Sequence, residues 1–261
     1  MKESIKTVKY NFHIWVDAIA FKLSMEIQTE IYKAIADVDY QKLQAEFQAQ
    51  NELLVVENFL PNSMIEKFLA LLPSLQPAIN RNYIPNHKKG GSISRYSLDS
   101  LAPIFGEFYQ LSAFFEFLNK ITAEKLLPCP DADPHTYALY FYTEPGDHIQ
   151  YHYDTSYYHG KRYTVLLGLV DDSSSKLEYQ LYKDIPERET QTRSLSLTAG
   201  TLVLFNGDKL YHRVTPLGEN EQRIVLTLEY VTDTRMGMLK RFVSNMKDAI
   251  AYFGFRQVFR S

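Results

Sequence analysis

The chain has 261 residues, of which 45% are hydrophobic and 23% charged, so it is long enough to bury a large core. Its formal net charge of −3 gives no general attraction to a phosphate backbone, and we therefore expect no nucleic-acid partner. No apolar run has the length of a membrane span or signal peptide, and the single cysteine cannot form an intrachain disulfide, which favours a cytoplasmic protein without membrane contact.

The first third of the chain has a helical pattern. Residues 17–50 contain neither Pro nor Gly, and apolar side chains recur at helical spacing. Residues 53–57 form a short apolar run typical of a strand. Pro61 then fits the first turn of a helix that carries residues 64–72. We expect residues 1–52 to be a helical extension of the domain that follows.

The middle of the chain predicts a loop and then more helix. Residues 82–97 include Pro85, Gly90 and Gly91, which are typical of a loop, and loops of this length are commonly functional. Residues 100–126 return to a helical pattern rich in Phe. The loop is expected to flank the entrance to a site.

From residue 136 the chain changes to short β-branched or aromatic runs separated by Gly, Pro, Asp and Ser. The predicted strands lie at 137–142, 163–170, 177–181, 195–197, 201–205 and 224–231. Such strands predict a double-sheet jelly roll. The predicted fold is α+β, with a double-stranded β-helix (jelly-roll) core at about residues 136–232, a helical N-terminal half and an amphipathic C-terminal helix at 238–253. Residues 53–261 would form one domain.

Two histidines and one aspartate in the β half have the pattern of metal ligands. Alternate side chains of a strand face the same side, so His152 and Asp154 would point together, with Tyr153 opposite. His212 would add a third donor from a strand distant in sequence. Mixed nitrogen and oxygen ligation with open positions suits Fe(II). A His-x-Asp pair alone is common on protein surfaces, so the flanking sequence decides the assignment.

The sequence around these ligands resembles one enzyme family. Gly146 and Ile149 precede His152 by six and three residues, the run 200–205 precedes His212, and Arg223 follows eleven residues later. This order resembles the 2-oxoglutarate- and Fe(II)-dependent oxygenases, particularly their prolyl-hydroxylase-like branch, which show G-x-x-I-x-x-H-x-D, G-x-L-V-x-F, H-x-V and a basic residue one strand later. The resemblance implies a dioxygenase that uses Fe(II), 2-oxoglutarate and O2 to hydroxylate an unactivated C–H bond, with release of succinate and CO2.

The resemblance also implies which residues bind the cosubstrate. Arg223 is expected to pair with the distal carboxylate of 2-oxoglutarate, because a guanidinium matches a carboxylate in two hydrogen bonds. Tyr142 lies near the position of the family tyrosine that binds the cosubstrate, and Tyr140 shares its face. Thr164 is expected to line the pocket. Gly168 stands where some relatives carry a second tyrosine, which would leave extra room.

The expected substrate is a small polar molecule, such as a free amino acid or a natural-product intermediate. Its expected contacts are Tyr157, Tyr158, Arg162 and Arg95, which come from the aromatic and basic segments that flank the entrance. No catalytic residue is expected beyond the metal ligands. Two alternatives stay open: a hydroxylase of a peptide or protein residue, and a non-catalytic jelly-roll module that binds a metal or ligand.

Overall fold

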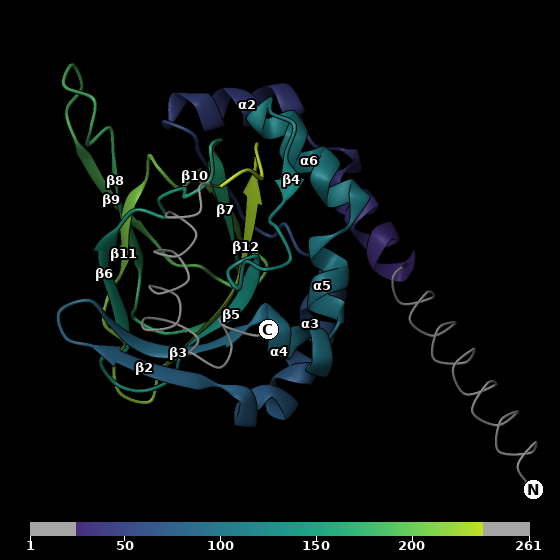
Figure 1. Cartoon of the computed structure of the whole chain (residues 1–261), viewed down its shortest axis with the longest axis vertical. Coiled ribbons are helices and arrows are strands. Elements are labelled where there is room, and N and C mark those ends of the chain that lie inside the picture. Colours follow the sequence, from purple (N-terminus) through teal and green to yellow (C-terminus); the bar gives the residue numbers. More distant parts are fainter. Residues whose placement is uncertain (1–24, 237–261) are drawn as a thin grey trace, which may run out of the picture.

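The computed structural model describes residues 25–236, which form a curled antiparallel sheet with helices along one side (Figure 1). Residues 1–24 and 237–261 lie outside the described part. The start of the predicted helix at 17–50 and the whole predicted helix at 238–253 therefore fall outside it. Across residues 25–236, no helix combines the length and apolar character needed to cross a membrane.

The helices form a layer on the outer side of the sheet (Figure 1). Residues 25–36 are helical. The helices that follow are α2 (Tyr40–Ala49), α3 (Asn62–Leu75), the short 3-10 helix η1 (Gln76–Ala78), α4 (Arg95–Leu101), α5 (Ile104–Tyr109) and α6 (Ser112–Thr122).

The predicted helix at 17–50 is divided in the structure. Within the described residues it is helical at 25–36, and α2 begins at Tyr40. Asp39 separates the two pieces, because its side chain accepts a hydrogen bond from the backbone N–H of Lys42 and caps the start of α2. The helical spacing of apolar residues continues across this cap, so it did not reveal the break.

Aromatic side chains join the helices to the sheet in the main core. Phe68 of α3 stacks on Phe105 of α5 with ring centroids 4.8 Å apart. Tyr230, which belongs to the sheet, contacts Phe114 and Phe115 of α6. Burial of this large aromatic surface stabilises the contact between the two layers. The helix predicted at 64–72 is confirmed by α3, and the helical region predicted at 100–126 is confirmed as two helices, α5 and α6.

Within residues 25–236 the strands form one antiparallel sheet of 12 strands that curls on itself as a jelly roll. The α+β class and the jelly-roll core are therefore confirmed. In spatial order the sheet contains β1 (Leu53–Val56), β10 (Leu202–Asn206), β7 (Arg162–Asp172), β12 (Gln222–Val231), β5 (Tyr137–Tyr142), β3 (Lys88–Ser94), β6 (His148–His152), β11 (Tyr211–Val214), β8 (Leu177–Leu181) and β9 (Gln191–Leu195). To the side of this path, β2 (Asn80–Ile84) pairs with β3, and β4 (Leu127–Pro128) pairs with β12.

Most predicted strands match observed ones. The predictions at 53–57, 137–142, 163–170, 177–181, 201–205 and 224–231 are confirmed by β1, β5, β7, β8, β10 and β12. The prediction at 195–197 is wrong, because the strand in this region is β9 at Gln191–Leu195. Among the described strands, β9 pairs only with β8, at the end of the sheet. It is largely exposed, so its polar sequence gives no apolar run.

The loop predicted at 82–97 is also wrong. Its residues form the hairpin of β2 and β3, which turns at residues 85–87, and then the start of α4. Gly91 lies inside β3, where an added Cβ would meet Ile79 Cγ2 at 2.6 Å and Phe141 Cβ at 3.3 Å. The glycine therefore marks a close approach between packed segments and not a break in the strand.

Candidate metal centre and ligand pocket

Strand pairing places two histidines side by side inside the sheet. His152 ends β6, and its direct antiparallel partner is His212 on β11. The centroids of the two imidazole rings are 4.3 Å apart. On the opposite face of the same strands, Tyr151 stacks on Tyr211 with centroids 4.9 Å apart. Alternation along the strands thus fixes both imidazoles on one face and both phenols on the other.

Asp154 completes a group of three donors. Its Oδ1 lies 3.4 Å from Nε2 of His152, and its Oδ2 lies 3.9 Å from Nε2 of His212. One donor atom from each of the three residues lies within 4.8 Å of the other two. The expectation that His152 and Asp154 share a strand is wrong, because β6 ends at His152 and Asp154 lies in the segment that follows.

The two imidazoles are held in the same orientation. Nδ1 of His152 lies 2.8 Å from the carbonyl oxygen of Gln150, and Nδ1 of His212 lies 3.1 Å from that of Leu210. When Nδ1 donates to these carbonyls, Nε2 of each ring faces Asp154 with a lone pair available. Such hydrogen bonds are typical of metal-binding histidines, because they fix the tautomer and the ring plane.

Electrostatics keep His212 and Asp154 in the forms that bind a metal. Burial lowers the pKa of His212 to about 4, helped by His152 and opposed by Asp154, so this ring is neutral at pH 7. Burial alone would raise the pKa of Asp154, but His212, His152 and Arg162 together hold it well below its ordinary value. Neutral imidazole and ionised carboxylate are the species that coordinate a cation.

Arg223 lies buried in the same pocket and makes few hydrogen bonds with the rest of the described chain. It belongs to β12, pairs across the sheet with Tyr142 and is 1% exposed. Its Nη1 is 3.5 Å from the carbonyl oxygen of Ser175, and its Nε, also buried, has no hydrogen-bond partner among residues 25–236. Burial lowers the pKa of the guanidinium, opposed by Tyr142 and Asp171. A buried cation with an unmet donor is unfavourable unless an anion pairs with it.

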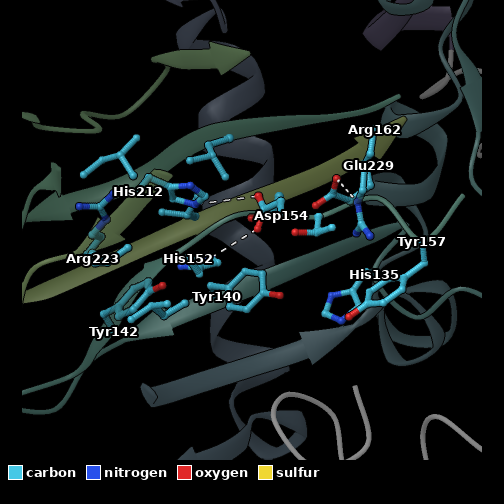
Figure 2. A pocket seen from close by; sticks show the side chains of 17 residues that line it. His135, Tyr140, Tyr142, His152, Asp154, Tyr157, Arg162, His212, Arg223 and Glu229 are labelled. Carbon is cyan, nitrogen blue, oxygen red and sulfur yellow. Dashed lines mark hydrogen bonds and ion pairs between the residues drawn. The ribbon is translucent and has the colours of Figure 1, made fainter. Parts of the chain in front are cut away.

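The pocket has two ends on either side of the three donors. Figure 2 shows Arg223 and Tyr142 on one side of the donors, and Arg162, Glu229, His135 and Tyr157 on the other. Apolar side chains fill much of the wall between these groups, namely Ile149, Leu166, Leu177, Val214 and Val225.

Three of the expected contact residues lie elsewhere. Thr164 does not line the pocket but places its hydroxyl 2.9 Å from Oδ2 of Asp154. Tyr158 is buried, and its hydroxyl donates to Asp133 at 2.6 Å. Arg95 forms an ion pair with Asp131 at 3.3 Å and does not line the pocket. Of the expected substrate contacts, Tyr157 and Arg162 do line the pocket.

Two pocket residues, Glu229 and His135, were not predicted from the sequence, and the expectation for Gly168 was wrong. Glu229 lies on β12, is 4% exposed and lines the pocket together with His135. Burial and the nearby Asp154 raise the pKa of Glu229 to about 7, opposed by Arg162. The only signal in the sequence was one carboxylate in the mainly apolar second half of this strand. Gly168 leaves no extra room, because an added Cβ would lie 2.3 Å from the carbonyl oxygen of Thr198.

Comparison with known proteins identifies the fold. No family model matches the sequence, and neither does any curated protein. Among solved structures, the epimerase SnoN in complex with Fe3+, alpha-ketoglutarate (2-oxoglutarate) and nogalamycin RO is similar, with a TM-score of 0.61, 12% identity, and 74% of this chain and 83% of that chain covered.

Two further solved structures are similar to this chain in fold. A prolyl hydroxylase from Trichoplax adhaerens, in complex with a peptide fragment of the hypoxia inducible factor oxygen degradation domain, has a TM-score of 0.59 at 13% identity and covers 84% of this chain and 96% of its own. HygX from Streptomyces hygroscopicus, with nickel and 2-oxoglutarate bound, has a TM-score of 0.52 at 13% identity and covers 72% and 85%. At these identities the likeness shows a shared fold: this chain has the jelly roll of the 2-oxoglutarate/Fe(II) oxygenases.

Proposed function

We propose that this protein is an Fe(II)- and 2-oxoglutarate-dependent dioxygenase. It would hydroxylate an unactivated C–H bond of a small polar substrate, such as a free amino acid or a natural-product intermediate. One observation carries the proposal: a single pocket holds two imidazoles and a carboxylate with donor atoms within 4.8 Å, and also a buried guanidinium whose Nε has no partner within the described residues.

The residues of this pocket fit the cofactor and cosubstrate. His152, Asp154 and His212 would hold Fe(II), since two imidazoles and one carboxylate leave coordination positions for other ligands. Arg223 would pair with the distal carboxylate of 2-oxoglutarate, with Tyr142 beside it. When bound, iron and 2-oxoglutarate supply the oxidation of the C–H bond, with release of succinate and CO2.

The protein itself orients the groups and limits the access of water. Carbonyl oxygens fix the imidazole rings, and the hydroxyl of Thr164 donates to Asp154 at 2.9 Å. The apolar wall of the pocket excludes water from the charged groups, which strengthens each electrostatic contact within it.

There are alternatives to hydroxylation as the reaction and to a small molecule as the substrate. SnoN is an epimerase with this fold, so the fold serves other outcomes than hydroxylation. The Trichoplax adhaerens enzyme is solved with a peptide, which supports hydroxylation of a peptide or protein residue as the second candidate. A non-catalytic binding module would have no use for a buried, unmatched Arg223 beside three metal donors, so we do not favour it.

The test is oxygen-dependent turnover. The protein is loaded with Fe(II) and 2-oxoglutarate without air, then exposed to air with free amino acids or cell extract. We expect succinate release that requires Fe(II), and a product heavier by one oxygen atom in mass spectrometry. Succinate without any gain of oxygen would favour another oxidative outcome, and the absence of iron-dependent succinate release would exclude a dioxygenase.

A further inference from the structure

An ion pair occupies the end of the pocket opposite Arg223. Arg162 begins β7, and Glu229 lies on the adjacent strand β12, two residues away from the direct partner of Arg162. Nε of Arg162 donates to Oε2 of Glu229 at 2.8 Å. The two residues are 7% and 4% exposed, and both line the pocket. The pair is therefore buried but faces the cavity (Figure 2).

The pair presents unused hydrogen-bonding groups of both kinds. Oε2 of Glu229 accepts from Nε of Arg162 and lies 3.0 Å from the hydroxyl of Thr164. Within the described part of the chain, neither the two Nη atoms of Arg162 nor Oε1 of Glu229 has a hydrogen-bond partner. Arg162 thus offers N–H donors to the cavity, and Glu229 beside it offers an acceptor.

The charges of the pair select among possible ligands. A simple anion at Arg162 would be repelled by the ionised form of Glu229, and a simple cation at Glu229 would be repelled by Arg162. A molecule with a carboxylate and an ammonium group on one carbon can satisfy both groups at once. Charge-assisted hydrogen bonds from such a molecule are stronger than neutral ones.

We propose that Arg162 and Glu229 form the binding site for the head group of a zwitterionic substrate, an α-amino acid or a compound with the same carboxylate and ammonium groups. This deepens the proposed function and rests on it for the role of the bound molecule as substrate. The binding itself does not depend on that function.

The position of the pair suits a substrate of the metal centre. The hydroxyl of Thr164 bridges the two carboxylates, at 2.9 Å from Oδ2 of Asp154 and 3.0 Å from Oε2 of Glu229. A head group at the pair therefore leaves the rest of the molecule close to the three donors. Arg223 remains available for a dicarboxylate at the other end (Figure 2).

Thermal shift with the full chain and Mn(II) tests the proposal without turnover. The melting temperature is measured with 2-oxoglutarate, and separately with each proteinogenic L-amino acid at millimolar concentration. We expect at least one amino acid to raise it, since a ligand of the native state stabilises that state. Its deamino acid and its decarboxylated amine should bind at least about 10-fold more weakly, since each lacks one charged group.

Variants assign the binding to the pair. Glu229→Gln is nearly isosteric and should weaken amino-acid binding by about 10-fold or more, and Arg162→Gln by at least as much, while the response to 2-oxoglutarate persists and reports a folded pocket. Glu52→Gln removes another buried carboxylate, and Arg213→Gln another paired arginine, both outside the pocket. These two controls should keep the amino-acid response.

Three results would overturn the proposal: no amino acid binds, the deamino acid binds as well as the amino acid, or Glu229→Gln binds like the unmodified protein. The outcome separates this proposal from the proposed function. A response to amino acids without one to 2-oxoglutarate would refute the dioxygenase and leave the head-group site standing. A response to 2-oxoglutarate without one to any amino acid would refute the head-group site alone.

Discussion

At the scale of single residues, the candidate metal centre is oriented before any metal arrives. Nδ1 of both histidines lies against a backbone carbonyl, so each Nε2 already faces Asp154. A preoriented set of donors loses little conformational freedom when it binds an ion. His152 and His212 should therefore contribute to metal affinity as a unit and not independently.

We expect His212→Ala to weaken Mn(II) binding by at least about 100-fold and to abolish turnover, because one of three donors is removed. Calorimetric titration with Mn(II) measures the affinity, and circular dichroism checks that the fold remains. His148→Ala is the control, since this histidine lies on β6, the strand of His152, but does not line the pocket. Unchanged metal affinity in His212→Ala would refute the centre.

Arg223→Gln should raise the dissociation constant of 2-oxoglutarate by about 100-fold or more, because the charge-assisted pair with the distal carboxylate is lost. Metal affinity should change little, which distinguishes this effect from damage to the donors. The control is Arg213→Gln, which removes an arginine bound to Glu178 outside the pocket. Normal cosubstrate affinity in a titration of Arg223→Gln would contradict its role.

The sequence allowed some of these residues to be found and not others. His152, Asp154, His212 and Arg223 were suggested by the motifs around them, whose order and spacing resemble those of the 2-oxoglutarate/Fe(II) oxygenases. Glu229 gave only the weak signal of one charge in an apolar run. Its ion pair with Arg162 arises from the alignment of β7 with β12, which no local pattern encodes.

At the scale of elements, adjacent glycines in β3 provide a sharp test of packing. Gly91→Ala should lower the free energy of unfolding by about 1–3 kcal/mol, because its Cβ would lie 2.6 Å from Ile79 Cγ2. Gly90→Ala is the matched control, since the nearest atom to its Cβ would be 3.5 Å away. Urea denaturation of both variants measures the difference. Equal stability would contradict the close approach of β3 to its neighbours.

Buried strands could be predicted from the sequence, and exposed strands could not. β5, β8 and β12 were found because buried strands carry unbroken or alternating apolar residues. The strand predicted at 195–197 was misplaced relative to β9, because an exposed edge strand needs no such apolar pattern. The hairpin of β2 and β3 was missed because proline and glycine mark both turns and close contacts, and only the packed neighbours distinguish the two.

At the scale of the whole molecule, Glu52 connects the helical layer to the sheet through hydrogen bonds. It lies at the boundary predicted between the extension and the domain, and it is 8% exposed. Its carboxylate accepts hydrogen bonds from Lys209 at 2.6 Å and from Asn206 at 2.7 Å, and the hydroxyl of Tyr163 donates to it at 3.1 Å. The part of the extension within the described residues packs on the domain through α2, which contacts α6 and β1.

This cluster predicts a pH dependence of stability. Burial alone would raise the pKa of Glu52. Lys209, Asn206 and Lys161 together lower the pKa by more than burial raises it, so the net shift is downward from 4.5. The stabilisation is present above the unfolded-state pKa and is lost as the pH falls through the lower folded-state pKa.

Glu52→Gln should therefore lower the free energy of unfolding by about 1–3 kcal/mol at pH 7, and by progressively less in acid, because the native carboxylate is then protonated as well. Urea denaturation across this range measures the effect. Glu124→Gln, which removes a less buried partner of Lys161, should change stability by less than about 1 kcal/mol. A pH-independent difference for Glu52→Gln would contradict this account.

The alignment of β6 with β11 has a consequence for how the protein can vary. Sliding either strand by one position would turn Tyr151 or Tyr211 inward and carry an imidazole out to solvent, which would disrupt the candidate metal centre without a substitution of any of its three donor residues. The stacked phenols on the outer surface oppose this slippage. We therefore expect that substitutions on that surface, remote from the three donors, can weaken metal binding by shifting the two strands relative to each other.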